Sequence, residues 1–160
     1  MNQAYLLIGG NIGDRELALQ TACQWIEKEA GRILQRSPLY HTEAWGKTDQ
    51  PAFLNQCLQI KTLFQPLELL RILLAIEQKM GRQRTVKLAP RNIDIDILLF
   101  NDISIETPEL TIPHPEMPRR RFVLTPLAEI APERMHPVLR QSIKDLLSAC
   151  PDPLTATKLA

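Results

Sequence analysis

The chain has 160 residues, of which 44% are hydrophobic and 23% are charged, so its composition is that of a soluble globular protein with a buried core. Its formal net charge is +1, which gives no bulk electrostatic reason to expect a nucleic-acid or membrane-surface partner. The three cysteines have neither the even number of a disulfide framework nor the spacing of a metal site, and they predict a reducing compartment, the cytoplasm.

The first residues of the chain, MNQAYLLIGGN, predict a strand and no targeting signal. They carry no basic segment, and their apolar run is shorter than the core of a secretory signal. No stretch of the sequence reaches the roughly 20 apolar residues that cross a membrane. We therefore expect no membrane association.

Apolar periodicity predicts three strands and one helix in the first half of the chain. Asp14 is a suitable N-cap for the helix, and Gly31 is a suitable residue to end it. Cys23 and Cys57 fall within these elements, and we expect them to be small buried hydrophobic residues. In chain order the elements are a strand over 5–8, a helix over 14–31, a strand over 32–42 and, after a turn-rich loop at 42–51, a strand over 53–64.

The second half is predicted to begin with a helix from Pro66, a residue that suits the first helical turn, to Gly81. Asn101-Asp102 predicts a hairpin turn, and about 151–160 we expect a frayed tail. The other elements are a basic loop at 82–92, a strand over 93–100, a short strand over 103–105, and short helices near 121–130 and 139–149. This order predicts an α+β fold, a ferredoxin-like antiparallel sheet flanked by helices, in a single domain over 1–160.

Asp94 and Asp96 form an unusual pair, because they interrupt an apolar strand, NIDIDILLF. Side chains alternate along a strand, so the two carboxylates share one face, with their Cα atoms roughly 6–7 Å apart. Leu98 and Phe100 are expected on that same face, so the carboxylates lie next to the part of the strand that is buried from water. Three explanations remain open: a solvated face, pairing with Arg91, or divalent cations, since Mg²⁺ takes one or two carboxylates together with substrate phosphates.

Positive charge is concentrated in two loops of the sequence. A solvated charged surface is the ordinary explanation for such clusters. Guanidinium groups also bind phosphate through forked hydrogen bonds, and a basic loop that leads into an acidic pair has the components of a nucleotide-dependent transferase. The first cluster has five cations and no acid, Lys79, Arg82, Arg84, Lys87 and Arg91, and the second is Arg119, Arg120 and Arg121.

Two further motifs carry less information. GGNIGD at 9–14 is not followed by GK[ST] and does not have GxGxxG spacing, so it predicts a tight strand-to-helix turn rather than a phosphate-binding loop. His114 lies between Pro113 and Pro115, where a histidine can donate to a phosphate. His41 and His136 have no partner in the pattern, and no Ser-His-Asp arrangement is supported.

Four stretches of the sequence together resemble the 6-hydroxymethyl-7,8-dihydropterin pyrophosphokinase family. They are YLLIGGNIGD at 5–14, SPLYHTEAWGKTDQPAFLN at 37–55, the stretch from GRQR to PRNIDIDILLF at 81–100, and IPHPEMPRRRFVLTPLAEIAP at 112–132. Each is weak alone, but their order and spacing extend the resemblance over nearly the whole chain. The resemblance implies transfer of the β,γ-diphosphate of ATP to the pterin hydroxymethyl oxygen in folate biosynthesis, which leaves AMP.

The resemblance also implies roles for individual residues. Asp94 and Asp96 match the family's aspartates that hold two Mg²⁺ ions, and Arg82 and Arg91 match arginines that contact the phosphates and assist transfer. No residue matches a general base. Further positions that match ATP contacts are Glu77, Arg84, Ile97, Thr111, His114 and Arg120. The positions that match the pterin pocket are Thr42, Phe53, Asn55, Phe122 and the main chain of Glu43 and Trp45.

The sequence departs from the family at two positions near the implied site. Family members often have Trp-Gly before the Pro-Arg pair, where this chain has Leu88-Ala89. An aromatic lid is therefore absent from this position, and Leu88 is left to exclude water. Trp45 stands where some relatives have a smaller apolar residue. We expect activity with altered loop kinetics.

Other functions differ from this one in testable ways. Another ATP-dependent phosphoryl or nucleotidyl transferase on a similar sheet would release ADP or pyrophosphate instead of AMP. A single-stranded RNA-binding sheet needs exposed aromatic residues on its central strands, but the chain has only two Trp, two Tyr and four Phe. An inactive relative is disfavoured because the acidic pair and the arginines are present. We expect a monomer with small-molecule substrates only.

Overall fold

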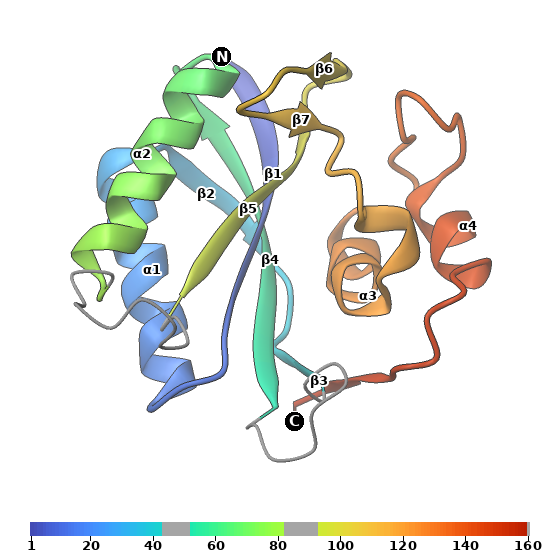
Figure 1. Ribbon diagram of the computed structural model, residues 1–160, viewed down its shortest axis with the longest axis horizontal. Helices are drawn as coiled ribbons and strands as arrows, with labels where there is room; N and C mark the ends of the chain where they lie inside the picture. Colours follow the sequence, from blue (N-terminus) through green and yellow to red (C-terminus); the bar gives the residue numbers. More distant parts are fainter. Residues whose placement is uncertain (43–51, 82–92, 160) are drawn as a thin grey trace.

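The computed structural model describes residues 1–42, 52–81 and 93–159 of the chain. These residues form strands in the first two thirds of the chain, interrupted by two helices, and mainly helices after them (Figure 1). In chain order the elements are β1 (Asn2–Gly10), α1 (Arg15–Glu29), β2 (Arg32–Arg36), β3 (Tyr40–Thr42), β4 (Phe53–Thr62), α2 (Pro66–Lys79), β5 (Asp94–Phe100), β6 (Ile105–Glu106), β7 (Thr111–Ile112), the 3-10 helix η1 (Met117–Arg119), α3 (Arg121–Ile130), α4 (Ile143–Ser148) and β8 (Ala156–Lys158).

The main sheet has the strand order β5-β1-β4-β3-β8, and β2 also pairs with β4. Every pairing within it is antiparallel. The long central pair β1 and β4 runs in register from Asn2 opposite Thr62 to Gly10 opposite Leu54. The predicted α+β fold with an antiparallel sheet and flanking helices is confirmed.

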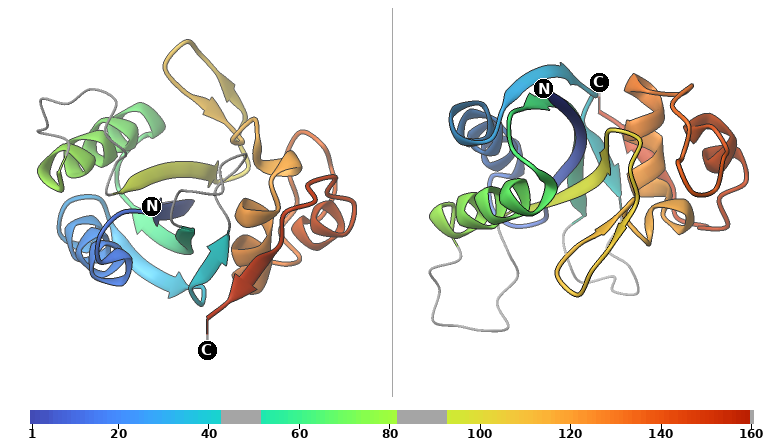
Figure 2. Two further views of the ribbon diagram at one scale, coloured as in Figure 1. Left: turned by 60° about the horizontal axis from the view of Figure 1, so that its bottom comes forward. Right: turned by 90° about the horizontal axis from the view of Figure 1, so that it is seen from above.

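Helices cover both faces of the sheet (Figures 1 and 2). Helices α1 and α2 pack on one face, where the buried residues form a cluster that we call the α1/α2 core. Helix α3 packs on the other face and α4 packs against α3, and the buried residues there form the α3/α4 core. Strand alternation divides the side chains between them, because Leu6 and Ile8 of β1 enter the α1/α2 core, whereas Tyr5 and Leu7 enter the α3/α4 core.

The predicted starts of α1 and α2 are confirmed. The carboxylate of Asp14 accepts a hydrogen bond from the backbone N–H of Leu17 at 3.1 Å, so Asp14 caps α1. Pro66 occupies the first turn of α2, where its missing N–H costs nothing. Cys23 and Cys57 are buried, as expected for small hydrophobic residues.

The single strand expected over 32–42 is two strands, β2 and β3, which pair with different ends of β4. Between them, the N–H of Ser37 donates to the carbonyl of Cys57 at 2.8 Å, and its hydroxyl accepts from the N–H of Cys57 at 2.9 Å. Pro38 follows and has no N–H to continue the ladder. The hydroxyl of Ser37 thus replaces a backbone partner at the break.

The hairpin expected between strand 93–100 and strand 103–105, with its turn at Asn101-Asp102, is not formed by those two strands. Strand β6 pairs with β7, and the turn between them is held by Thr107, whose hydroxyl accepts from the N–H of Leu110 at 3.0 Å. Strand β5 also contains a bulge, because Leu6 lies opposite Ile97 but Tyr5 lies opposite Leu99. The bulge turns Phe100 into the α1/α2 core, so it does not share a face with Leu98 as the alternation predicts.

The C-terminal region also differs from the prediction. Helix α4 is shorter than the expected 139–149, because Arg140 has a left-handed φ of 60° and cannot continue a helix. Part of the segment expected to be a frayed tail is ordered in a strand, because β8 pairs with β3 and places Ala156 opposite Thr42. Among the described helices, none has both the length and the apolar character needed to span a membrane.

Candidate active site

The acidic pair lies on the edge strand β5. Asp94 lies opposite Gly9 of β1 and is half-buried, whereas Asp96 lies opposite Leu7 and is exposed. Between them, the buried Ile95 donates its backbone N–H to the carboxylate of Glu77 at 2.7 Å. Glu77 is itself only 4% exposed, so this bond ties the end of α2 to the start of β5. The two carboxylates therefore project from a strand segment that a hydrogen bond to α2 holds in place.

A cavity of about 270 Å³ lies beside Asp96, and it brings together several predicted ATP contacts. Ile97 of β5, Thr111 of β7 and His114 line it with Asp96. The backbone N–H of His114 donates to the carbonyl of Leu98 at 3.0 Å, which fixes the loop after β7 against β5. Burial lowers the pKa of His114, and the nearby Asp96 carboxylate opposes this only in part.

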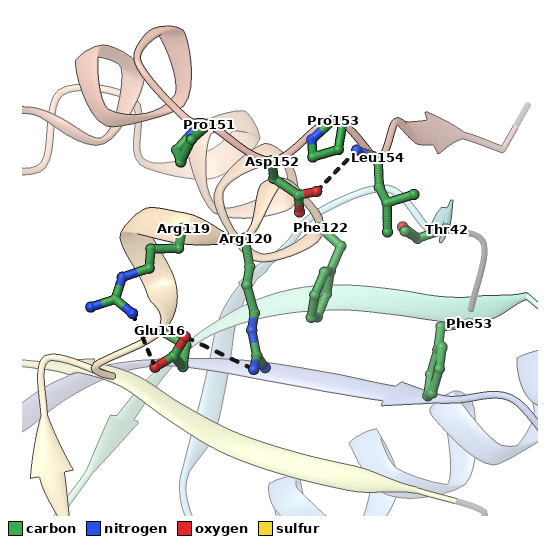
Figure 3. Close-up of a pocket in the computed structure, with 10 residues that line it drawn as sticks. All are labelled: Thr42, Phe53, Glu116, Arg119, Arg120, Phe122, Pro151, Asp152, Pro153 and Leu154. Carbon is green, nitrogen blue, oxygen red and sulfur yellow. Dashed lines mark hydrogen bonds and ion pairs between the residues drawn. The ribbon is translucent and has the colours of Figure 1, made fainter. Parts of the chain in front are cut away.

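A second cavity, of about 490 Å³, lies between the sheet and α3 (Figure 3). Its lining includes Thr42 of β3, Phe53 of β4 and Phe122 of α3, three of the predicted pterin contacts. The rings of Phe53 and Phe122 approach it from the sheet and from the helix. An apolar cavity with an aromatic ring on each of two elements suits a flat heteroaromatic ligand.

Two buried polar atoms have no hydrogen-bond partner among the described residues, the hydroxyl of Thr42, which lines this cavity, and the amide nitrogen of Asn55, two positions after Phe53 on β4. Both side chains are 3% exposed. In the sheet, Thr42 lies opposite Phe53 and Asn55 lies opposite Tyr40, so both belong to the β3–β4 ladder. An unmade buried hydrogen bond costs about 1–3 kcal/mol, so these atoms favour a ligand that supplies the missing partners.

Gly9 makes room for the amide of Asn55. A Cβ atom at position 9 would lie 2.0 Å from Oδ1 of Asn55, far inside van der Waals contact. Strand β1 therefore needs glycine beside this side chain. This glycine belongs to the GGNIGD motif, and it lies opposite Asn55 in the β1–β4 ladder.

In the 119–121 cluster, two arginines line the 490 Å³ cavity and the third binds the C-terminal segment. Arg120 lines the 490 Å³ cavity, with its guanidinium 5.9 Å from the centre of the Phe122 ring and 4.0 Å from the carboxylate of Glu116. Arg119 lines the same cavity and lies 3.8 Å from Glu116. Arg121 instead turns to the C-terminal segment, where its side chain donates to the carbonyls of Cys150 and Asp152.

Sequence reasoning missed several residues that line the 490 Å³ cavity. Glu116 and the segment 151–154 are among them, and no local spacing connects that segment to β3. Five predicted site residues, Glu43, Trp45, Arg82, Arg84 and Arg91, lie outside the described residues, as do Leu88 and Ala89.

The donors of the acidic pair fit magnesium. In the described ranges, no three His, Cys, Asp or Glu side chains converge as they do in a metal centre built from protein alone. Magnesium commonly takes one or two carboxylates and completes its shell with water and substrate phosphate. Asp94 and Asp96, on one strand face, provide such a donor set.

Comparison with known proteins gives a consistent result. The family model for 7,8-dihydro-6-hydroxymethylpterin-pyrophosphokinase (HPPK) matches residues 5–132. The chain is 47% identical over 130 residues to the 2-amino-4-hydroxy-6-hydroxymethyldihydropteridine pyrophosphokinase of Bacillus subtilis, covering 81% of this chain and 78% of that protein. The protein of the same name from Aquifex aeolicus is 41% identical over 145 residues, covering 91% of this chain and 90% of its own.

Two longer proteins also match. The chain is 44% identical over 149 residues, 92% of its length, to the folic acid synthesis protein fol1 of Schizosaccharomyces pombe, of which it spans only 20%. The crystal structure of Plasmodium falciparum HPPK-DHPS with pteroate superposes with a TM-score of 0.76 at 21% identity, covering 92% of this chain and 44% of that one. At this identity the superposition supports the fold alone.

Proposed function

We propose that this chain, which belongs to the 7,8-dihydro-6-hydroxymethylpterin-pyrophosphokinase family, catalyses the reaction for which that family is named. In this reaction the hydroxymethyl oxygen of 6-hydroxymethyl-7,8-dihydropterin forms a bond to the β-phosphorus of ATP. The bond between that phosphorus and the oxygen bridging to the α-phosphorus breaks, and the hydroxyl proton is lost. The products are the pterin diphosphate, an intermediate of folate biosynthesis, and AMP.

The observation that carries this proposal is the pair of buried polar atoms without a partner, one on Thr42, which lines the 490 Å³ cavity, and one on Asn55 of the adjacent strand β4. The hydroxyl of Thr42 and the amide of Asn55 can pair with the donor and acceptor edge of a pterin. Phe53 and Phe122 line the same cavity, which supports contact between their rings and the faces of the pterin. Glu43 and Trp45 complete the proposed pocket through their main chain, as the resemblance implies.

ATP is proposed to lie along the acidic edge of β5. Asp94 and Asp96 would hold two Mg²⁺ ions, which supply charge neutralisation and orientation for the triphosphate when they are bound. Ile97, Thr111 and His114 line the cavity beside Asp96, which suits contacts with the rest of the nucleotide. Glu77, Arg84 and Arg120 are assigned to ATP by the resemblance, and Arg82 and Arg91 to the transferred phosphates. Positioning and charge supply most of the catalysis in such transfers, so no general base is assigned.

Three broader assignments complete the proposal. Residues 1–160 act as a single domain, the protein works as a monomer, and the reaction takes place in the cytoplasm. The substrates are ATP and the pterin, without nucleic acid or membrane.

The test is to mix the purified protein with Mg²⁺, ATP and 6-hydroxymethyl-7,8-dihydropterin and to identify the nucleotide product by ³¹P NMR. We expect AMP, formed only when the pterin is present. ADP or free pyrophosphate would instead indicate another class of transferase. A folded protein that binds ATP and releases no AMP would contradict the assigned substrate.

A further inference from the structure

We infer that the C-terminal segment 151–158 is a fixed wall of the pterin pocket and that Arg121 is the positioning residue that holds it there. The inference rests on the proposed function, because it assigns the 490 Å³ cavity to the pterin. It adds Leu154 as a residue that limits the size of the bound heterocycle. It also gives the third arginine of the 119–121 cluster a role other than binding phosphate.

Arg121 makes three hydrogen bonds to a segment about thirty residues further along the chain. Its backbone N–H donates to the carboxylate of Asp152 at 3.0 Å. Its side chain donates from Nε to the carbonyl of Asp152 at 3.2 Å and from Nη2 to the carbonyl of Cys150 at 3.0 Å. Bonds to charged groups are stronger than neutral ones, so this contact holds the segment at one end.

The Asp152 carboxylate links this contact to the cavity. One oxygen accepts from Arg121 at the N-terminus of α3, where a negative charge is favourable. The other oxygen accepts from the backbone N–H of Leu154 at 2.9 Å, which directs the chain along the cavity (Figure 3). Pro151 and Pro153 limit the backbone on each side of Asp152. Asp152, Pro153 and Leu154 all line the cavity, together with Thr42 and Phe122.

The other end of the segment is held by β8. Thr42 lies opposite Ala156 in the β3–β8 ladder, so the wall runs directly beside a buried polar group of the proposed pocket. Lys158 lies 2.9 Å from Glu129 of α3, and the same carboxylate accepts from the hydroxyl of Tyr40 of β3. The hydrogen bonds from Tyr40 and Lys158 hold the pKa of Glu129 below its ordinary value. The segment between the two attachments therefore has little freedom to leave the cavity.

Arg121 directly precedes Phe122, the aromatic residue of α3 that lines the cavity. The contact to Asp152 and the placement of the ring therefore depend on the same turn of backbone. Removing the Arg121 side chain should loosen the wall while leaving the acidic edge of β5 in place. The affinity for the pterin should then fall, and the affinity for ATP should not.

The experiment compares steady-state kinetics of the whole protein with Arg121→Ala, Arg121→Lys, Leu154→Ala and Leu154→Met, with Arg32→Ala as the control, since Arg32 is an exposed arginine on β2. We expect Arg121→Ala and Leu154→Ala each to raise the KM for the pterin about tenfold, with the KM for ATP unchanged. Arg121→Lys and Leu154→Met should lose less, and Arg32→Ala should behave as the unchanged protein. An equal rise in both KM values, or no rise, would overturn the inference.

A second measurement keeps this test separate from the proposed function. Amide hydrogen exchange over 154–158 should be faster in Arg121→Ala than in the unchanged protein or in Arg32→Ala, whether or not the enzyme turns over. Unchanged slow exchange would overturn the role of Arg121. A protein that forms no AMP and binds no pterin would refute the proposed function and the pterin wall together, and the exchange result would then decide only whether Arg121 holds the segment.

Discussion

Glu77 and Ile95 are joined by a hydrogen bond of 2.7 Å, from the backbone N–H of Ile95 to the carboxylate of Glu77. Both residues are buried, and Ile95 lies between Asp94 and Asp96. The resemblance assigns Glu77 to the nucleotide, but in the structure its carboxylate also supports the strand that carries the acidic pair. This relationship joins the stability of the fold to the geometry of the proposed metal site.

Glu77→Ala should lower the free energy of unfolding by about 1–3 kcal/mol, because the buried N–H of Ile95 loses its acceptor. Glu77→Gln keeps an oxygen at that place and should lose less. Urea denaturation of both variants measures the difference, with Gln78→Ala on the exposed side of the same helix as the control. Equal losses from Glu77→Ala and Glu77→Gln would show that the hydrogen bond is not the stabilising contact.

Asp96→Ala should reduce turnover by more than about a hundredfold, because a metal held near the phosphates contributes several kcal/mol to transfer. The side chain of Asp96 is exposed, so the fold should survive and circular dichroism should be unchanged. The control is Glu133→Ala, which removes a carboxylate that is 76% exposed and paired with Lys144. Normal turnover by Asp96→Ala would exclude the metal assignment.

Arg82→Ala should lower kcat more than it weakens ATP binding. The expectation comes from the resemblance, which places Arg82 at the phosphates where charge develops during transfer. Single-turnover rates and equilibrium ATP titration separate the two effects. Arg82→Lys keeps the charge without the forked geometry, so its kcat should lie between those of Arg82→Ala and the unchanged protein. Equal losses in rate and in binding would refute the assignment.

Gly9→Ala should raise the KM for the pterin about tenfold and leave the KM for ATP unchanged. The added Cβ would lie 2.0 Å from Oδ1 of Asn55, so the Asn55 amide would have to move. Gly13→Ala is the matched control. Gly13 has a positive φ of 61° but has no atom within 4 Å of an added Cβ, so this change should cost about 1 kcal/mol of stability without affecting the pterin. A similar pterin KM for the two variants would contradict the role of Gly9.

His136 should make the protein less stable in mild acid. Burial lowers its pKa from the ordinary value of 6.5, so the unfolded chain binds a proton at a higher pH than the folded one. Its stabilising contribution is therefore complete above about pH 6.5 and is lost as the pH falls through the lower folded value. Its Nδ1 accepts from the N–H groups of Val138 and Leu139, and protonation removes this acceptor.

The measurement for His136 is the urea midpoint at several pH values between 7.5 and 5. His136→Asn places an amide oxygen near the position of Nδ1 and has no proton to gain, so its stability should fall less with pH. Both proteins retain His114, whose titration therefore cancels in the comparison. A pH dependence as steep in His136→Asn as in the unchanged protein would assign the effect to other groups.

The sequence predicts the local features of the fold well, because they depend on neighbouring residues. Asp14 caps α1 and Pro66 begins α2 through contacts within a few positions of each residue. Strand β8 could not be predicted in this way, since Ala156–Lys158 has no apolar alternation and is held by backbone pairing to β3. The bulge in β5 was missed for a related reason, because a bulge is a property of the pair of strands.

In the candidate site, too, some positions can be predicted from the sequence and contacts between distant residues cannot. Among the described positions matched by resemblance, Ile97, Thr111 and His114 line one cavity, and Thr42, Phe53 and Phe122 line the other. Arg120, which the resemblance matches to ATP, lines the second cavity rather than the first. The contact between Arg121 and Asp152 spans a sequence separation of 31 and leaves no trace in the residue pattern. Side chains that act through distant backbone groups are therefore the part of a site that requires coordinates.

The position of β5 between the two cores has a consequence for the way the molecule unfolds. Its side chains enter both cores, with Ile97 and Phe100 in the α1/α2 core and Leu98 and Leu99 in the α3/α4 core. Neither half of the protein can then melt without withdrawing side chains from the other, which favours a single cooperative transition. Because the acidic pair sits on this shared strand, partly melted molecules that retain an intact catalytic edge should be rare.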